Sequence, residues 1–280
     1  MPKTLTAAEV EAYHTRGYHF PVQIFSESEA AEIYRGLREV EARHGIRIEG
    51  RLNQKPHLLF TLIDRLVRHP KILDAVEDVI GPNIFCWSSQ FFIKEPNDGT
   101  YVSWHQDGTY WGLSSTDIVT AWVALTPSTP ESGCMRVVPG THLKQLEHTD
   151  TFEQKNLLSR GQEIAVKVDE REAVDVVLQP GQMSLHHVLI VHGSEPNRAT
   201  LPRVGFAIRY MPTYVRQKMG ETDSALLVRG VDTYGHFEHE QSPEEDLHPA
   251  AVERHKRIID RQLRILYAGA KQPGKLGPVA

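Results

Sequence analysis

The sequence is poor in cysteine, with only Cys86 and Cys134 among its 280 residues. Two cysteines cannot build a disulfide framework, and these two do not form the Cys-x-x-Cys pair that is typical of redox and zinc sites. We interpret both as small buried hydrophobic side chains in a reducing compartment. The composition therefore argues against a disulfide-rich secreted scaffold.

Long apolar runs and an excess of one charge are also missing. No run approaches the ~20 apolar residues that are needed to span a bilayer. The N-terminus lacks the apolar segment of a secretory signal. The formal net charge of -5 gives no reason to expect a nucleic acid or an anionic membrane as a partner. We therefore expect a cytoplasmic protein.

The middle of the chain, from Asn83 to Met211, consists of short runs rich in β-forming residues, separated by turn signals such as Pro139-Gly140. No helix of crossover length separates most of these runs, which argues against a parallel sheet and favours a sandwich or a barrel. The runs are Ile84–Lys94, Thr100–His105, Ile118–Thr126, Cys134–Val138, Ala173–Leu178, Met183–Val191 and Arg203–Met211.

One polar and weakly patterned segment, His142–Glu172, interrupts these runs. We interpret it as a long loop with little structure of its own, and such loops are usually functional or mobile. Because it lies between two strands that approach the candidate site described below, we expect it to act as a lid.

Helical patterns flank the β-rich core. Before it, Thr6 and Ser26 begin capping-box signatures, an amphipathic pattern covers Glu27–His44, and two shorter patterns lie between Leu58 and Ile80. After it, a polar stretch leads to an amphipathic pattern over Pro249–Ala268. We predict a mainly β fold with helical flanks in a single domain, divided into a helical N-terminal flank at 1–82, a barrel core at 83–211 and a C-terminal extension with a helix at 212–280.

The sequence has 15 histidines, and histidine is the commonest metal ligand in proteins. His105 and Asp107 are two residues apart at the end of a β run, so their side chains point to the same face. A second imidazole would complete the triad of two histidines and one carboxylate that binds non-haem iron. Another His-x-Asp triplet, His148-Thr-Asp150, lies in the polar segment, and we interpret it as solvated loop.

Three histidines of one run, His186, His187 and His192, are candidates for the third ligand. His186 and His192 share strand parity, but six strand residues span about 20 Å, so both reach one ion only if the strand kinks. His192 stands at the strand end beside Gly193 and is the better ligand. We interpret His186 and His187 as hydrogen-bonded packing residues.

Arg203 begins the last run of the β-rich core. It shares a face with Gly205 and Ala207, and these small residues leave room in front of the guanidinium. A guanidinium in that position suits a bidentate carboxylate. An ordinary salt bridge to an acidic residue of the protein remains the alternative.

Four motifs occur in a characteristic order: His105-Gln-Asp107, Pro139-Gly-Thr-His142, His192-Gly-Ser194 and Arg203. Together they resemble the phytanoyl-CoA dioxygenase family of Fe(II)- and 2-oxoglutarate-dependent oxygenases, of which ectoine hydroxylase is a bacterial member. The resemblance covers about 90–211. Ser132 and Thr141 replace an Asn and a Ser of the family pattern, and both changes are mild.

The resemblance implies a double-stranded β-helix, which is a jelly-roll or cupin-like barrel. It implies Fe(II) bound by His105, Asp107 and His192, with 2-oxoglutarate and O2 as co-substrates and succinate as a product. Asp107 fills the position that is a small residue in halogenating relatives, so hydroxylation is favoured over halogenation. The family pattern assigns four further residues to 2-oxoglutarate or its surroundings: Arg203, Thr120, Ser194 and Gln90.

The substrate is expected to be a small molecule, such as an amine, an amino acid, an aminoalkylphosphonate or a natural-product intermediate. Aromatic side chains are expected to line its pocket: Tyr101, Tyr110, Trp111 and Trp122. Two other functions fit a metal site on such a barrel, namely a zinc hydrolase and a non-catalytic binding protein. A carboxylate-binding set at Arg203, Thr120 and Ser194 distinguishes the oxygenase, because a hydrolase does not require it.

Overall fold

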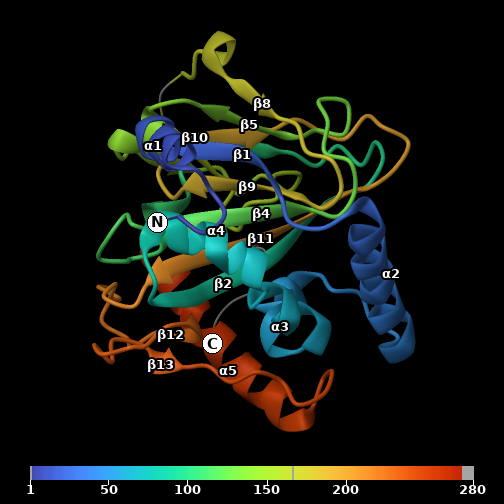
Figure 1. The fold of residues 1–280 in the computed structure, drawn as a ribbon, viewed down its shortest axis with the longest axis vertical. Helices are drawn as coiled ribbons and strands as arrows, with labels where there is room; N and C mark the ends of the chain where they lie inside the picture. Colours follow the sequence, from blue (N-terminus) through green and yellow to red (C-terminus); the bar gives the residue numbers. More distant parts are fainter. Residues whose placement is uncertain (1, 166, 273–280) are drawn as a thin grey trace.

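The computed structural model describes residues 2–165 and 167–272, and most of its strands lie in two sheets (Figure 1). The large sheet has the order β1 (Tyr18–Gln23), β9 (Gln182–His187), β4 (Val119–Ala124), β11 (Arg203–Pro212), β2 (Ile84–Lys94), β12 (Ser224–Arg229) and β13 (Glu238–His239). The small sheet has the order β3 (Val102–His105), β10 (Val191–Ser194), β5 (Met135–Val138) and β8 (Val174–Val176). Apart from the β12–β13 pair, neighbouring strands run antiparallel.

Helices lie mainly at the two ends of the described chain: α1 (Ala7–Arg16), α2 (Glu27–His44), α3 (Thr61–Val67), α4 (Pro70–Ile80) and α5 (Pro249–Leu266). Short 3-10 turns connect other elements: η1 (Gly50–Asn53), η2 (Pro56–Leu58), η3 (Asp107–Tyr110), η4 (Thr141–Leu143) and η5 (Glu170–Glu172). Both predicted capping boxes form, with Thr6 and Ser26 each accepting from the third helical N–H. No described helix is long and apolar enough to cross a membrane.

The two faces of β11 have different surroundings. Its even-numbered side chains, from Val204 to Tyr210, pack in the main core with buried residues of α3 and α4, and Tyr210 Oη donates to the Val67 carbonyl. Helix α4 lies over this face of the large sheet (Figure 1). The odd-numbered face, with Arg203 and Arg209, instead lines a cavity shared with the small sheet. The alternation of β11 therefore places its arginines between the sheets.

This arrangement is the double-stranded β-helix, and the prediction of a mainly β fold is confirmed. Two flank assignments need correction. The N-terminal flank was expected to be helical, but it also contributes β1, whose Pro21 is tolerated because β1 is an edge strand. The C-terminal extension contributes β12, which pairs with β2 and carries the sheet beyond Met211.

The predicted run Met183–Val191 is not one strand. The chain turns at residues 188–190, so that β9 belongs to the large sheet and β10 to the small sheet. Gly108 N–H donates to the Val188 carbonyl and fixes this turn. The break allows His186 and His192 to approach each other, with ring centroids 5.1 Å apart.

The segment His142–Glu172 has more structure than predicted. Apart from Val166, which lies outside the described residues, it includes a hairpin of β6 (His148–Asp150) and β7 (Gln162–Ile164). Ser103 donates to the Gln162 carbonyl and attaches this hairpin to β3. Short polar strands of three residues carry too little periodicity to be recognised in a sequence.

Candidate active site

His105, Asp107 and His192 come together where β3 meets β10. The two histidines are opposite each other in the strand register, and η3 begins with Asp107. All three side chains are buried, and one ligand atom of each lies within 4.8 Å of the others. His105 Nε2 and Asp107 Oδ1 are 3.4 Å apart. This donor set and spacing fit one divalent ion.

Backbone carbonyls fix the orientation of both imidazoles. His105 Nδ1 donates to the carbonyls of Ser103 at 2.9 Å and His192 at 3.1 Å, and His192 Nδ1 donates to Ile190 at 3.0 Å. Because a carbonyl can only accept, each Nδ1 must carry the hydrogen. The lone pair of each Nε2 therefore remains for a metal, which is the usual outer support of a ligating histidine.

The protonation states also suit a cation. Burial lowers the pKa of His192 well below its ordinary value, so the ring is neutral near pH 7. Burial alone would raise the pKa of Asp107, but Arg209 and the contact with His105 bring it below the ordinary range of a carboxyl. The cluster thus offers a neutral imidazole at His192 and an ionised carboxylate at Asp107.

His186 is not the hydrogen-bonded packing residue that was predicted. Its ring is buried beside His192, and Nδ1 has no hydrogen-bond partner among the described residues. It lines the cavity between the sheets. His187 does match the prediction, because its Nδ1 accepts from Leu189 N–H and its ring contacts His142.

Arg203 lies in the same cavity, buried and without a carboxylate partner within 4.0 Å among the described residues. Its Nη1 donates to the Gly133 carbonyl at 2.7 Å, but Nε has no partner. The guanidinium is 5.3 Å from the centre of the Trp122 ring. Trp122 also occupies the space in front of Gly205, where an added Cβ would come within 1.8 Å of the ring. The small residue therefore accommodates Trp122, and the space in front of it is not empty as the sequence suggested.

A buried lysine, Lys94, stands opposite Arg203 in the register of β2 and β11. Burial and the charge of Arg203 lower the pKa of Lys94 to about 6. Its Nζ lies 2.6 Å from Ser194 Oγ and also contacts the carbonyls of Ser194 and Glu195. Because Lys94 Nζ donates to Ser194 Oγ, the serine hydrogen is free for another acceptor. The Arg203 guanidinium, which has no acidic partner among the described residues, and the free serine hydrogen fit an anion.

Thr120 also lines this cavity, and its buried Oγ1 has no partner among the described residues. The register places it opposite Arg209 and His186, whereas Arg203 begins β11 six residues earlier. Since Arg209 Nε is 4.0 Å from Asp107 Oδ2, Thr120 belongs to the end of the cavity near the three ligands. Because Thr120 and Arg203 line the same cavity, a role of Thr120 toward the carboxylate that Arg203 binds stays a prediction.

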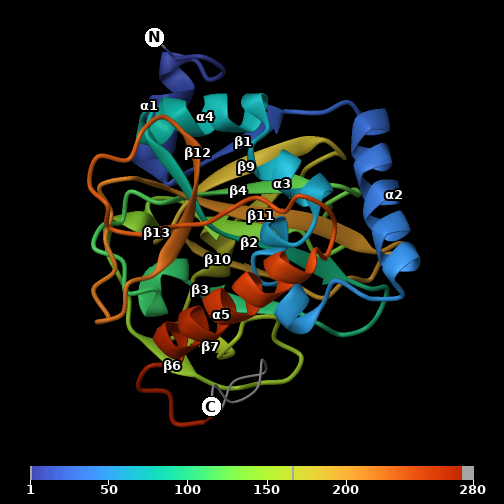
Figure 2. The same cartoon turned by 90° about the horizontal axis from the view of Figure 1, so that it is seen from below.

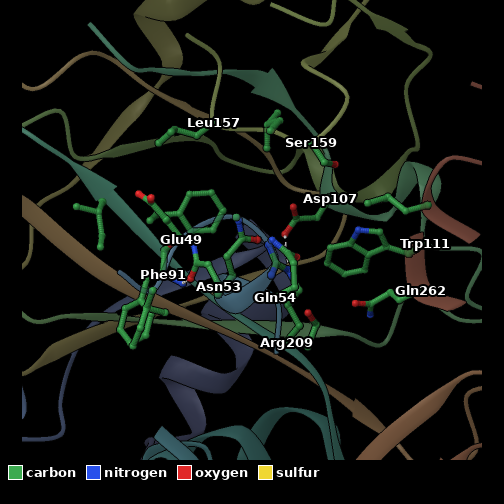
Figure 3. Close-up of a pocket in the computed structure, with 18 of the residues that line it drawn as sticks. Glu49, Asn53, Gln54, Phe91, Asp107, Trp111, Leu157, Ser159, Arg209 and Gln262 are labelled. Atoms are coloured by element: carbon green, nitrogen blue, oxygen red, sulfur yellow. Dashed lines mark hydrogen bonds and ion pairs between the residues drawn. The ribbon is translucent and has the colours of Figure 1, made fainter. Parts of the chain in front are cut away.

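A larger cavity of about 460 Å³ opens beside Asp107 (Figure 3). Tyr110 and Trp111 line it, as expected from the sequence. Gln90, which was assigned to the 2-oxoglutarate set, lines this cavity and not the one that holds Arg203. Tyr101 does not line the larger cavity, and its backbone pairs with Lys155 and Leu157. Trp122 does not line it either and lies beside Arg203 instead.

His148 is not a solvated loop residue. Its Nε2 accepts from Gln106 N–H at 2.9 Å, and its side chain is partly buried. Asp150 forms an ion pair with Arg160. This His-x-Asp triplet is therefore structural. It fixes the β6–β7 hairpin next to Gln106, the residue between His105 and Asp107.

Arg209 and Gln262 line these cavities but were not predicted as site residues from the sequence. Lys94, which contacts Ser194, was not predicted either. Arg209 shares the odd face of β11 with Arg203, so the alternation of the strand already pointed it inward. Gln262 could not be found in this way, because no sequence pattern tells which cavity a C-terminal helix covers. Figure 2 shows α5 beside β6 and β7, and the Leu266 carbonyl accepts from Arg160.

Known proteins share this fold and sequence. A family model described as phytanoyl-CoA dioxygenase matches residues 1–205. The probable alpha-ketoglutarate-dependent hypophosphite dioxygenase of Stutzerimonas stutzeri is 30% identical over 224 residues, which cover 73% of this chain and 78% of that protein. The match to human peroxisomal phytanoyl-CoA dioxygenase is 32% identical but spans only 40% of that protein and 46% of this chain.

Solved structures give the same result over more of the chain. The apo form of the non-heme monooxygenase ThoJ is 38% identical with a TM-score of 0.80, and the match covers 92% of this chain and 96% of ThoJ. CytC3, solved with Fe(II) and alpha-ketoglutarate, is 27% identical with a TM-score of 0.67, covering 87% of this chain and 96% of CytC3. The chain belongs to the phytanoyl-CoA dioxygenase family of Fe(II)- and 2-oxoglutarate-dependent oxygenases.

Proposed function

We propose that His105, Asp107 and His192 bind Fe(II), and that the enzyme hydroxylates a small organic molecule in the cavity of about 460 Å³. The observation that carries this proposal is the pairing of two features. A ligand triad with free Nε2 atoms lies in one cavity with a buried arginine that has no acidic partner among the described residues. A metal and a dicarboxylate would satisfy both.

In this proposal Arg203 binds the far carboxylate of 2-oxoglutarate. Lys94 acts through Ser194, because it occupies the serine oxygen and directs the serine hydrogen toward that carboxylate. Thr120 and His186, with their unpaired buried atoms, remain available at the end of the cavity nearest the triad. When bound, Fe(II) with 2-oxoglutarate and O2 supplies the oxidising chemistry, with succinate as a product.

The same arrangement explains how the reaction is kept from water. The triad is buried, and the hairpin and the α5 helix both contribute walls to the substrate cavity, through Leu157, Leu158 and Leu266. Enclosure of this kind directs an oxidising reaction to the bound substrate. The protein positions the substrate beside Asp107, and the metal and co-substrate carry the chemistry.

The three parts of the chain act as one catalytic unit in this proposal. Asn53 from 1–82, Trp111 from 83–211 and Gln262 from 212–280 all line the same cavity. Its size suits an amine, an amino acid, an aminoalkylphosphonate or a natural-product intermediate. The hydrolase and the non-catalytic barrel gain nothing from an unpaired Arg203, so we do not favour them.

Absorption spectroscopy under anaerobic conditions tests the metal and the co-substrate together. Adding Fe(II) and 2-oxoglutarate should produce a visible charge-transfer band, because a ligand chelates the iron through a keto group. His105→Ala and His192→Ala should abolish the band and the formation of succinate, with little change in melting temperature. His148→Gln is the matched control and should keep both.

No band in the parent protein, or full succinate formation by His105→Ala, would contradict the assignment. A zinc-dependent activity without 2-oxoglutarate would favour the hydrolase. The substrate itself can be sought by adding candidate metabolites and measuring which of them stimulate succinate formation.

A further inference from the structure

Arg209 is a buried cation that the proposed function has not yet used. Only 8% of the residue is exposed, and its buried Nε has no hydrogen-bond partner among the described residues. The nearest carboxylate oxygen is Asp107 Oδ2, which lies 4.0 Å from Nε and so beyond hydrogen-bond distance. A buried guanidinium without hydrogen bonds is costly unless a ligand completes it.

Arg160 is a buried arginine whose guanidinium nitrogens all have hydrogen-bond partners within the protein. Its Nε and Nη2 donate to Asp150, and its Nη1 donates to the Leu266 carbonyl. Arg209 differs, because its Nε has no hydrogen-bond partner among the described residues and its ion-pair contact with Asp107 is 4.0 Å long.

The position of Arg209 connects the two cavities, because it lines both. Its guanidinium lies 5.2 Å from the Trp111 ring centre and 6.0 Å from that of Phe92. Both distances are those of cation–π contacts, which limit the orientations of the guanidinium. Gln262 Nε2 is another buried donor without a partner in the larger cavity. Figure 3 shows Trp111 and Gln262 on one side of this cavity and Phe91 on the other, with Asp107 and Arg209 between them.

The separation of Arg203 and Arg209 along β11 indicates that they bind different ligands. They are six residues apart on one face of β11, which corresponds to about 20 Å along the strand. If Arg203 holds the far carboxylate of 2-oxoglutarate, Arg209 faces the substrate side of the triad. Its closeness to Asp107 places any group that it binds within a few bonds of the reacting position.

We propose, on the basis of the proposed function, that Arg209 binds an anionic group of the substrate, such as a carboxylate or a phosphonate. The fork of a guanidinium matches both groups bidentately. The carbon that is oxidised lies a few bonds from this group, and the rest of the substrate occupies the aromatic part of the 460 Å³ cavity. The substrate is therefore an organic acid, and a simple amine does not satisfy Arg209.

A matched pair of probes tests this proposal without knowledge of the natural substrate. 3-Phenylpropionate and 3-phenylpropanamide have nearly the same shape, and only the first is charged. Calorimetric titration into protein loaded with Ni(II) and 2-oxoglutarate should give about 10- to 100-fold tighter binding of the acid. Arg209→Gln should remove this preference and change the affinity for 2-oxoglutarate by less than about twofold.

Arg47 provides the control. It lines the same cavity, but its side chain is 56% exposed and faces Glu41 and Glu95. Arg47→Gln should leave the preference for the acid unchanged. Arg209→Lys keeps the charge and should retain part of the preference. Equal melting temperatures would show that each variant folds.

The proposal is overturned if the parent binds the amide as tightly as the acid, or binds neither at millimolar concentration. It is also overturned if Arg209→Gln weakens 2-oxoglutarate binding as strongly as Arg203→Gln, which would assign Arg209 to the co-substrate. Failure of the parent to bind 2-oxoglutarate with Ni(II) would instead count against the proposed function, so the two failures are distinguishable.

Discussion

Lys55 and Arg203 are both buried cations, but their surroundings differ. Lys55 Nζ donates to Glu240 and to the Ser224 carbonyl, and it lies in a cluster with His57. Burial alone would raise the pKa of Glu240, but Lys55 and His57 lower it to about 2. Burial lowers the pKa of Arg203 to about 10, and no described carboxylate offsets that burial.

The difference separates stability from binding. In the Lys55–Glu240 cluster the chain supplies both charges, and the pair connects the segment before η2 with the chain after β13. On the odd face of β11, Arg203 has no acidic partner among the described residues, so its compensating charge comes from a ligand. Changes in the first region should therefore alter the free energy of unfolding, and changes in the second should alter ligand affinity.

The largest effect on stability is expected from Glu240→Gln. This change leaves the Lys55 charge buried without compensation, which should lower the free energy of unfolding by about 3–5 kcal/mol. Urea denaturation measures it, and the affinity for 2-oxoglutarate should not change. The double variant Lys55→Met with Glu240→Leu should recover much of the loss, because both charges are then absent. Equal stability of parent and Glu240→Gln would show that the Lys55–Glu240 cluster does not stabilise the fold.

Arg203→Gln is the corresponding change in the second region. Loss of a charged partner in a buried site costs about 2–5 kcal/mol, so the dissociation constant for 2-oxoglutarate should rise by a factor between about 30 and several thousand. Calorimetric titration with Ni(II) measures this affinity. The melting temperature should not fall, because no acidic partner is left behind. Parent-like affinity would show that Arg203 is not the carboxylate anchor.

The stability of the fold should also depend on pH through the buried side chain of His255. Burial lowers the pKa of His255 to about 4, and its Nε2 donates to the Gln54 carbonyl at 2.6 Å. The unfolded chain binds a proton near pH 6.5 whereas the folded chain does not, so stability falls as the pH drops from about 6.5 to 4. His255 contributes roughly 3 kcal/mol to this loss.

His255→Gln tests this contribution, because glutamine keeps a donor for Gln54 but does not titrate. Between pH 7 and 4 the unfolding free energy of the parent should fall by roughly 3 kcal/mol more than that of the variant. Parallel curves would mean that His255 titrates normally in the folded protein.

The smallest effect concerns the predicted lid. Leu157, Leu158 and Ser159 of the β6–β7 hairpin line the substrate cavity, so their amides should exchange several-fold more slowly when the cavity is filled. Hydrogen exchange with Ni(II), 2-oxoglutarate and 3-phenylpropionate measures this, with α1 as an unaffected reference. Unchanged exchange in the hairpin would leave it as a fixed wall of the cavity.

Much of the site could be predicted because its residues stand at recognisable points of strands. His105, Asp107 and His192 lie at strand ends, and Arg203 lies on a face whose alternation is clear. The pairing register between neighbouring strands cannot be read from the sequence. In the structure, the register of β4 and β11 places Thr120 opposite Arg209.

The break between β9 and β10 was hidden for a different reason. Residues 182–194 are almost continuously buried, so no change in polarity marks the point where the chain leaves one sheet for the other. His186 was therefore assigned to packing along a single strand. Only the three-residue turn brings it beside His192.

The place of α5 has a consequence for how this enzyme could acquire new substrates. The family model ends at residue 205, after the three proposed iron ligands and Arg203, whereas Arg209 and all of α5 follow it. Gln262, Ile265 and Leu266 nevertheless form part of the cavity wall. Since α5 supplies no strand to either sheet, its cavity-facing side chains can be randomised as an independent module. A library at these three positions would retain the iron chemistry while varying which acid fits beside it.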